Sequence, residues 1–286
     1  MRRIEIEDIA MYYRQDGAGP PVLLLHGLGS SSEDWELQIP ALAERYKVFR
    51  PDLRGHGASS KPSGRSSVEL LARDVIALAR RLGTGPLHVI GVSLGGMVAF
   101  QIALDAPELV RSLTILNSGP EMKLMTVRQH VAIVGRFLTL RLFGLRRMAD
   151  ELAKRLFPKP EQGDLRETFV ARWSTNDAGA YERTLRGMIG WSVKARLCAI
   201  DCPVLVVSGD RDYTPVEAKA RYVAELPNAR LEVIEDSGHF TPFDQPARLN
   251  AILVAFLDEV TASAQTPARA SASHPALSDT VPGATS

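Results

Sequence analysis

The 286-residue sequence predicts a doubly wound, mostly parallel α/β sheet, and two features of its pattern support this prediction. First, short continuous apolar runs recur along the chain, as expected for strands that are buried on both faces of a parallel sheet. Second, segments with helical periodicity separate these runs, which is typical of strands joined by crossover helices. The composition, with 45% hydrophobic and 23% charged residues, is ordinary for a globular domain.

The expected strands fall into two groups. Residues 3–9 and 11–13 are predicted to form a hairpin, because Ile4 and Ile6 alternate with glutamates as in a strand with one wet face. The buried strands of the parallel sheet are then expected at 22–25, 48–49, 87–90, 113–116, 204–207 and, with a weaker pattern, 231–234.

Three helices are expected between or after these strands. The first should begin with the capping box Ser66–Glu69 and end at Gly83. The second should begin with the box Thr214–Glu217, where Pro215 would occupy the first helical position at no cost in hydrogen bonding. The last should begin at Pro246.

Residues 121–195 break the alternation, because they contain no strand-like run but repeated helical spacing. One apolar stripe consists of Val127, Val131, Val134 and Leu138, and another of Tyr181, Leu185 and Met188. We therefore expect a helical cap at 121–195, inserted into a core formed by 1–120 and 196–260.

The charge of this cap is unusual. Residues 122–194 hold 14 Lys/Arg and 7 Asp/Glu, a net charge of +7, whereas the whole chain carries only +1. The near-neutral total gives no sign of general affinity for nucleic acid or membranes. The local excess has two interpretations: a solvated basic face, or attraction of anionic substrates or surfaces.

Other segments give weaker signals. Ala, Ser, Thr and Pro make up 19 of the 26 residues in 261–286, so we expect this tail, including His274, to be disordered. We find neither a secretory signal nor an apolar stretch of membrane-spanning length, which favours a cytoplasmic location. Cys198 and Cys202 have no second pair and no nearby histidine, which argues against a metal site and favours free thiols over a disulfide.

The pattern Gly91–Gly95, G-x-S-x-G, directly follows the expected strand 87–90 and precedes a helical run. A nucleophile on such a tight turn needs small neighbours, because the backbone there is strained and closely packed. We therefore predict that Ser93 is a catalytic nucleophile. The following N–H group, of Leu94, would point toward a developing oxyanion.

A serine hydroxyl needs a base to take its proton. Of six histidines, His239 lies just after the last expected strand, where a loop reaches the nucleophile, and we predict it to be the general base. The base needs a carboxylate to hold its tautomer, and Asp212, after the strand 204–207, is the predicted acid. Asp210 and, more distantly, Glu121 remain alternatives.

The rest of the site is predicted from its neighbours in the sequence. The segment His26–Gly29 follows an apolar strand, and Leu28 N–H would be the second oxyanion donor. The apolar side chains of the cap suggest a hydrophobic acyl or alcohol group, with Trp173, Met188 and Trp191 as substrate-binding residues; the full set is Phe137, Leu138, Leu142, Phe143, Trp173, Met188 and Trp191.

With these motifs, residues 3–260 resemble the α/β-hydrolase superfamily. The resemblance rests on His26–Gly29, Pro51–Gly57, Gly91–Gly96, Gly209–Asp212 and Gly238–His239, in the chain order Ser, Asp, His. It implies an eight-stranded sheet with the cap inserted after strand 6, and a structural role for Asp52 and Arg54 beside the site. A serine at position 93 separates the chain from the superfamily's epoxide hydrolases and haloalkane dehalogenases, which use Asp there.

Within the superfamily the chain looks most similar to capped esterases and enol-lactone hydrolases. This resemblance implies a cofactor-free hydrolase that cleaves a small-molecule carboxylic ester or lactone through an acyl-enzyme. Four alternatives stay open: an acyltransferase, a carbon–carbon bond hydrolase, a cofactor-free haloperoxidase-like enzyme, and a non-enzymatic ligand receptor on the same fold.

Overall fold

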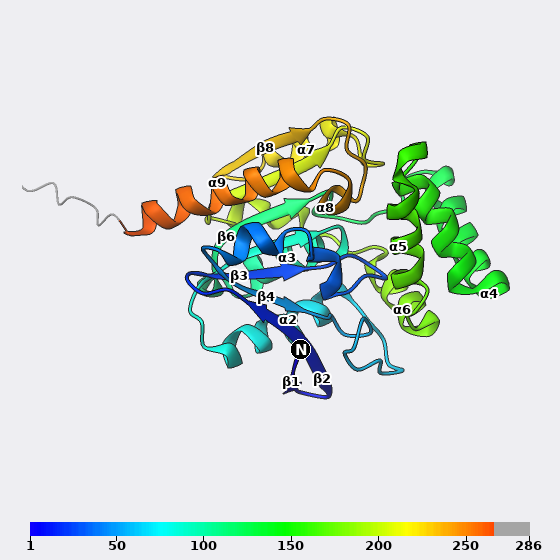
Figure 1. Ribbon diagram of the computed structural model, residues 1–286, viewed down its shortest axis with the longest axis horizontal. Coiled ribbons are helices and arrows are strands. Elements are labelled where there is room, and N and C mark those ends of the chain that lie inside the picture. Colours follow the sequence, from blue (N-terminus) through cyan, green and yellow to red (C-terminus); the bar gives the residue numbers. More distant parts are fainter. Residues whose placement is uncertain (266–286) are drawn as a thin grey trace, which may run out of the picture.

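An eight-stranded sheet runs through the centre of the molecule in the order β1-β2-β4-β3-β5-β6-β7-β8 (Figure 1). The structure is a computed structural model that describes residues 1–265. β1 pairs antiparallel with β2, and β2 with β4, while all other neighbours are parallel. The strands are β1 Arg2–Ile6, β2 Ile9–Asp16, β3 Pro21–Leu25, β4 Lys47–Pro51, β5 Leu87–Val92, β6 Val110–Leu116, β7 Val204–Gly209 and β8 Ala229–Ile234. The predicted fold class is therefore confirmed.

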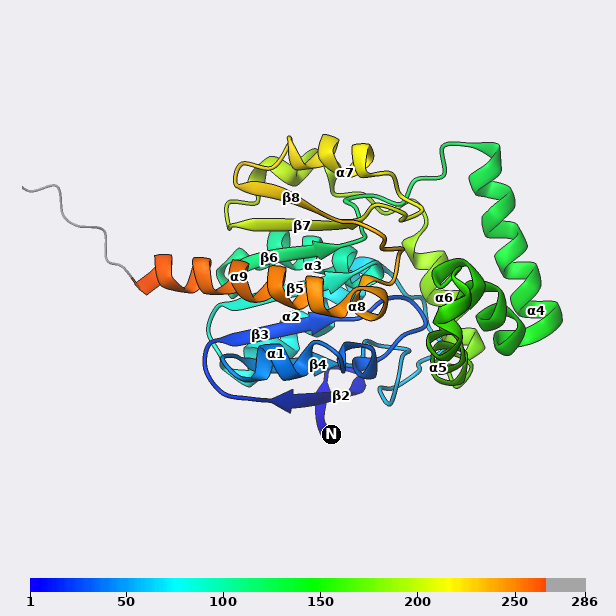
Figure 2. The ribbon, with the colours of Figure 1, turned by 45° about the horizontal axis from the view of Figure 1, so that its top comes forward.

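Helices cover both faces of the sheet (Figure 2). One apolar layer joins α2, α3 and α7 to the sheet, and a second joins α1 and α9 to its other face. The helices are α1 Ile39–Ala43, α2 Val68–Leu82, α3 Leu94–Asp105, α4 Val127–Leu156, α5 Gly163–Trp173, α6 Ala178–Met188, α7 Val216–Val223, α8 Thr241–Asp244 and α9 Pro246–Gln265. None of the helices within residues 1–265 is long and apolar enough to cross a bilayer.

After β6 the chain leaves the sheet and forms α4, α5 and α6, which gather at one end of the molecule with α4 outermost (Figures 1 and 2). Gly144, at φ +74°, divides α4 into two helical parts. A separate apolar cluster joins these helices to Phe240 and Phe243 of the core. The stripe of Tyr181, Leu185 and Met188 is buried there, whereas the stripe that begins at Val127 faces solvent.

The predicted helix starts need two corrections. Ser67, not Ser66, caps α2, because its side chain accepts the N–H of Leu70, while the Ser66 hydroxyl lies 3.3 Å from Thr184 Oγ1. At α7 the predicted box is absent, and Pro215 is itself the N-cap residue, with no side-chain hydrogen bond. The hairpin, the end of α2 at Gly83 in the left-handed region and the start of α9 at Pro246 are confirmed.

The tail prediction was wrong where it can be compared with the structure. Helix α9 continues through Thr261 to Gln265, and the Thr261 hydroxyl lies 3.1 Å from His88 Nε2. Residues 266–286, with His274, lie outside the described part of the chain. Cys198 and Cys202 are both free thiols.

Candidate active site

Ser93 occupies the tight turn between β5 and α3, with φ +53° and ψ −117°. This conformation is costly for a residue with a side chain, so its surroundings must hold it. The Ser93 N–H donates to Leu116 O at 3.0 Å, and Ser93 O accepts the Ser118 hydroxyl at 2.6 Å. The flanking glycines are required sterically, since a Cβ on Gly91 would lie 2.2 Å from Gly95 O.

Three loops bring the predicted nucleophile, base and acid together at the carboxyl ends of neighbouring strands. His239 Nε2, from the loop after β8, lies 3.0 Å from Ser93 Oγ. His239 Nδ1 lies 2.6 Å from Oδ1 of Asp212, which follows β7. When Nδ1 donates to the carboxylate, Nε2 is left as the acceptor that faces the serine hydroxyl.

Asp212 is held as an anion although its side chain has no exposed surface. Burial by itself raises the pKa of Asp212, but hydrogen bonding to His239 and the charge of Lys219 outweigh it and bring the pKa below the ordinary 3.8. Lys219, on α7, also donates to Thr214 O at 2.7 Å. Sequence reasoning missed this lysine because a single Lys in a helix indicates a solvated side chain.

Tyr213 is the second residue that sequence reasoning missed. Its ring stacks on the His239 imidazole, with 3.9 Å between the centroids and 27° between the planes. The stacking limits how far the imidazole can rotate away from the serine hydroxyl. Its position next to Asp212 is the one signal that could have indicated it.

The two alternative acids have other partners. Asp210 Oδ1 accepts the Ser237 N–H at 3.0 Å and thereby holds the loop that leads to His239. Arg211 pairs with Asp236 rather than with Asp210. Glu121 accepts the hydroxyl of Ser192 at 3.2 Å.

The loop after β3 and the start of α3 both border Ser93. Gly27 packs against it, since a Cβ built on Gly27 would lie 3.6 Å from Ser93 Cβ, and Leu28 follows directly. Leu94 begins α3, so its N–H is among the helix-start donors that the helix itself leaves unpaired. Leu28 and Leu94, the two predicted oxyanion residues, thus lie on the two segments that border Ser93.

The loop after β3 is held by buried polar side chains. Burial lowers the pKa of His26, so its neutral ring accepts the Leu53 N–H at Nε2 (3.0 Å) while Nδ1 lies 2.8 Å from Gly27 O. Asp52 accepts the backbone N–H groups of Ser32 and Ala58 at 2.7 and 2.9 Å. These bonds bind the turn after β4 to the loop that carries Leu28.

A cavity of about 540 Å³ opens onto Ser93 and His239 between the core and the helices α4–α6. Its lining is largely apolar and includes Leu28, Met97, Ile133, Trp173, Leu185 and Met188. Two of the predicted substrate-binding residues, Trp173 and Met188, thus line the cavity that reaches the serine.

Trp191 is placed elsewhere, which corrects its prediction as a substrate-binding residue. Its side chain packs in the apolar layer beside α3, and its indole N–H donates to Gln101 Oε1 at 3.0 Å. Leu138, Leu142 and Phe143, which we also expected near the substrate, are more than half exposed on α4.

Arg136 brings a charge to the wall of this cavity. Its guanidinium carbon lies 5.3 Å from the centre of the Tyr181 ring, and its Nε has no hydrogen-bond partner. Within residues 1–265 no carboxylate pairs with it. The other charged residues of the lining, Glu121 and Lys123, pair with each other at 3.2 Å.

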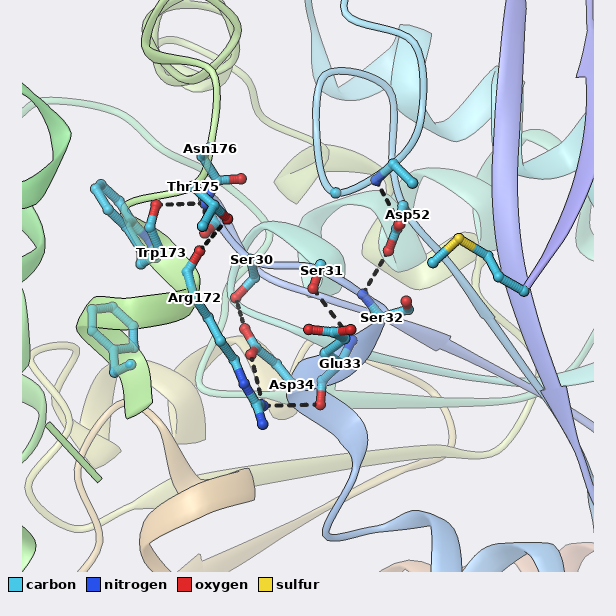
Figure 3. Close-up of a pocket in the computed structure, with 15 residues that line it drawn as sticks. Ser30, Ser31, Ser32, Glu33, Asp34, Asp52, Arg172, Trp173, Thr175 and Asn176 are labelled. Atoms are coloured by element: carbon cyan, nitrogen blue, oxygen red, sulfur yellow. Dashed lines mark hydrogen bonds and ion pairs between the residues drawn. The ribbon is translucent and has the colours of Figure 1, made fainter. Parts of the chain in front are cut away.

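A second cavity, of about 300 Å³ (Figure 3), shares Trp173 and Ser30 with the lining of the first. Its polar groups largely bond to one another: Asp34 accepts the Ser30 hydroxyl and lies 3.7 Å from Arg172. Burial raises the pKa of Asp34 to about 6 despite these two partners. The cluster ties the end of α5 to the loop after β3.

The chain is similar to known hydrolases in both sequence and fold. The profile of the family described as "alpha/beta hydrolase fold" matches residues 20–246. An uncharacterized protein of Mycobacterium tuberculosis is 31% identical over 270 residues, covering 86% of this chain and 77% of that protein. The 3-oxoadipate enol-lactonase 2 of Acinetobacter baylyi is 28% identical over 250 residues, which cover 85% of this chain and 91% of the lactonase. A thermophilic esterase from Thermogutta terrifontis superposes with a TM-score of 0.82 at 26% identity. The superposition covers 91% of this chain and 99% of the esterase chain.

Proposed function

Since the chain belongs to the α/β-hydrolase family, we propose that it is a serine hydrolase that cleaves a carboxylic ester or lactone through an acyl-enzyme on Ser93. The observation that carries the proposal is the continuous contact from Ser93 Oγ through the His239 imidazole to Asp212. A hydroxyl, a base and an orienting carboxylate in this order are the requirements of acyl transfer.

In the first half of the reaction, Ser93 Oγ attacks the substrate carbonyl carbon while His239 Nε2 takes the hydroxyl proton. The resulting imidazolium is stabilised by Asp212, and it returns the proton to the leaving alkoxide as the acyl-enzyme forms. In the second half, His239 takes a proton from water, the hydroxide attacks the acyl carbon, and the acid is released as Ser93 regains its proton.

The N–H groups of Leu28 and Leu94 are the proposed oxyanion donors. Both are backbone groups, one on the loop after β3 and one at the start of α3, so they need not reorganise when negative charge develops on the carbonyl oxygen. Preorganised donors of this kind each lower a barrier by about 3 kcal/mol in well-studied hydrolases.

The wall of the cavity supports the proposed substrate class. We propose that α4–α6, within 121–195, serve as a cap, with Trp173 and Met188 against an apolar acyl or alcohol group. The unpaired Arg136 in the same wall supports substrates that also carry an anionic group. A cytoplasmic location is part of the proposal and rests on the sequence pattern alone.

The test combines a chain-length series of p-nitrophenyl esters with a panel of lactones. Ser93→Ala should lower kcat by roughly 10⁴-fold or more while leaving the circular dichroism spectrum unchanged. Ser263→Ala, at an exposed serine of α9, is the matched control and should keep full activity.

An organophosphate should add its mass at Ser93; labelling at another serine with complete loss of activity would refute the proposal. Release of no more than one product per protein would favour a receptor instead.

A further inference from the structure

Helix α4 carries an exposed apolar stripe, formed by Val127, Val131, Val134, Leu138 and Leu142. Their exposed fractions range from 52 to 81%. Of the eleven large hydrophobic residues that are exposed within residues 1–265, seven lie between Met125 and Phe143. Such a concentration of exposed apolar side chains on one helix indicates a contact surface, since single exposed residues would be scattered.

The residues around the stripe are basic. From Met122 to Ala149 the chain holds six Lys and Arg residues and no Asp or Glu. Helical spacing sets Arg128 on one flank of the stripe and Arg141 on the other, and Arg146 follows just after the kink at Gly144. Arg141 pairs with Glu182, whereas Arg128 and Arg146 form no ion pair with any residue of the described chain.

The opposite face of the same helix belongs to the catalytic cavity, because Gln129, Ile133 and Arg136 line it. The stripe therefore points away from the cavity, and α4 is the outermost helix at that end of the molecule (Figure 2). A surface that met the stripe would lie one helix diameter, roughly 10 Å, from the cavity that contains Ser93.

We propose that α4 docks on an anionic lipid bilayer, with its apolar stripe in the boundary between headgroups and acyl chains. A helix with aliphatic residues on one face, cations on both flanks and modest overall hydrophobicity is the pattern of interfacial helices. Arg128, Arg141 and Arg146 would lie at the level of the lipid phosphates. These phosphates would be the counter-ions that residues 1–265 do not supply to Arg128 and Arg146.

The same charges argue against a second copy of the chain as the partner. A two-fold contact through the stripe would bring the flanking arginines of both copies together, and like charges at an interface disfavour association. Docking does not depend on the proposed hydrolysis, so binding and activity are separate measurements.

Binding is measured by co-sedimentation of the full chain with phosphatidylcholine vesicles, with and without phosphatidylglycerol. We expect binding that grows with the phosphatidylglycerol fraction and weakens as salt rises. Val131→Ser with Leu138→Ser should weaken it on the order of a hundredfold, and Arg128→Gln or Arg146→Gln by roughly fivefold each. The control pair Val233→Ser and Arg221→Gln, both exposed on the α/β core, should leave binding unchanged.

Orientation is measured by the fluorescence of Leu138→Trp with brominated lipids. The native Trp35, Trp173 and Trp191 are at most 5% exposed, so they contribute little quenching. On addition of the vesicles, the emission of Leu138→Trp should shift to the blue and be quenched by the brominated lipids. The emission of Val233→Trp, on β8, should not change.

Three results would overturn the proposal: no binding at any phosphatidylglycerol fraction, equal binding by the stripe variants and the control pair, or concentration-dependent dimerisation that the stripe variants abolish without any vesicle binding. The last result would assign the stripe to a second copy of the chain.

Discussion

Lys219 Nζ lies 2.6 Å from Oδ2 of Asp212, and neither side chain has any exposed surface. The other oxygen of the same carboxylate contacts His239. Asp212 is therefore engaged on both sides, by the Lys219 amino group and by the imidazole. An ion pair buried this completely stabilises the fold only while both members are present, because either charge alone in the interior is costly.

Lys219→Met should lower the free energy of unfolding by about 3–5 kcal/mol, because it leaves the Asp212 carboxylate buried without its cation. The measurement is chemical denaturation at neutral pH. Lys194→Met, at an exposed lysine 3.7 Å from Glu225, is the control and should change stability by no more than about 0.5 kcal/mol. The double variant Lys219→Met with Asp212→Leu should regain most of the loss; if it is as unstable as the single variant, the pair is not the cause.

Asp212→Asn should cost on the order of 10³- to 10⁴-fold in kcat near neutral pH, or about 4 to 5.5 kcal/mol. The amide keeps the shape of the carboxylate but can present its NH₂ to the ring and force the wrong tautomer. Asp210→Asn is the matched control and should cost less than about tenfold, since Asp210 accepts the backbone N–H of Ser237 rather than a proton from the His239 ring. A larger loss for Asp210→Asn on the same ester would reverse the assignment.

Arg136→Gln should lower kcat/KM by roughly tenfold for an ester that carries a carboxylate group, such as a p-nitrophenyl hemiester. The kcat/KM for a neutral ester should stay unchanged. The reason is that Arg136 is the cation in the cavity wall that lacks a carboxylate partner within residues 1–265. In the unmodified protein, kcat/KM for the anionic ester should fall with ionic strength while the neutral ester is insensitive. Arg221→Gln is the control, and equal responses of both esters would contradict a role for Arg136 in substrate charge.

Asp34→Asn should flatten the dependence of stability on pH between about 4 and 6. The folded carboxyl releases its proton at a pKa of about 6 and an unfolded aspartate near 3.8, so the folded state holds the extra proton between these values. The free energy of unfolding should therefore fall as pH rises through this window, by up to about 3 kcal/mol from this group. Thermal melts of both proteins at pH 4, 5, 6 and 7 measure the difference; identical slopes would exclude Asp34 as the source.

The strands that precede Ser93, Asp212 and His239 could be predicted from the sequence, because local patterns mark each of them. Apolar runs mark buried strands, and the glycines around Ser93 mark a turn in which a side chain at 91 would collide with backbone. The ends of helices were less readable. Ser66 and Ser67 are adjacent, and only the hydrogen bond to Leu70 distinguishes them.

The sequence by itself determined the alternating α/β architecture, the turn at Ser93 and the loops that carry Asp212 and His239, since each depends on residues close together in the chain. Only the tertiary structure decided which amphipathic face is buried, as the solvent-facing stripe of α4 and the inward-facing stripe of α6 illustrate. It also decided that Trp173 lines the cavity while Trp191 packs in the core, and that Lys219 is buried against Asp212. Periodicity records that a helix has an apolar side, but what that side meets is set by contacts between residues far apart in the chain.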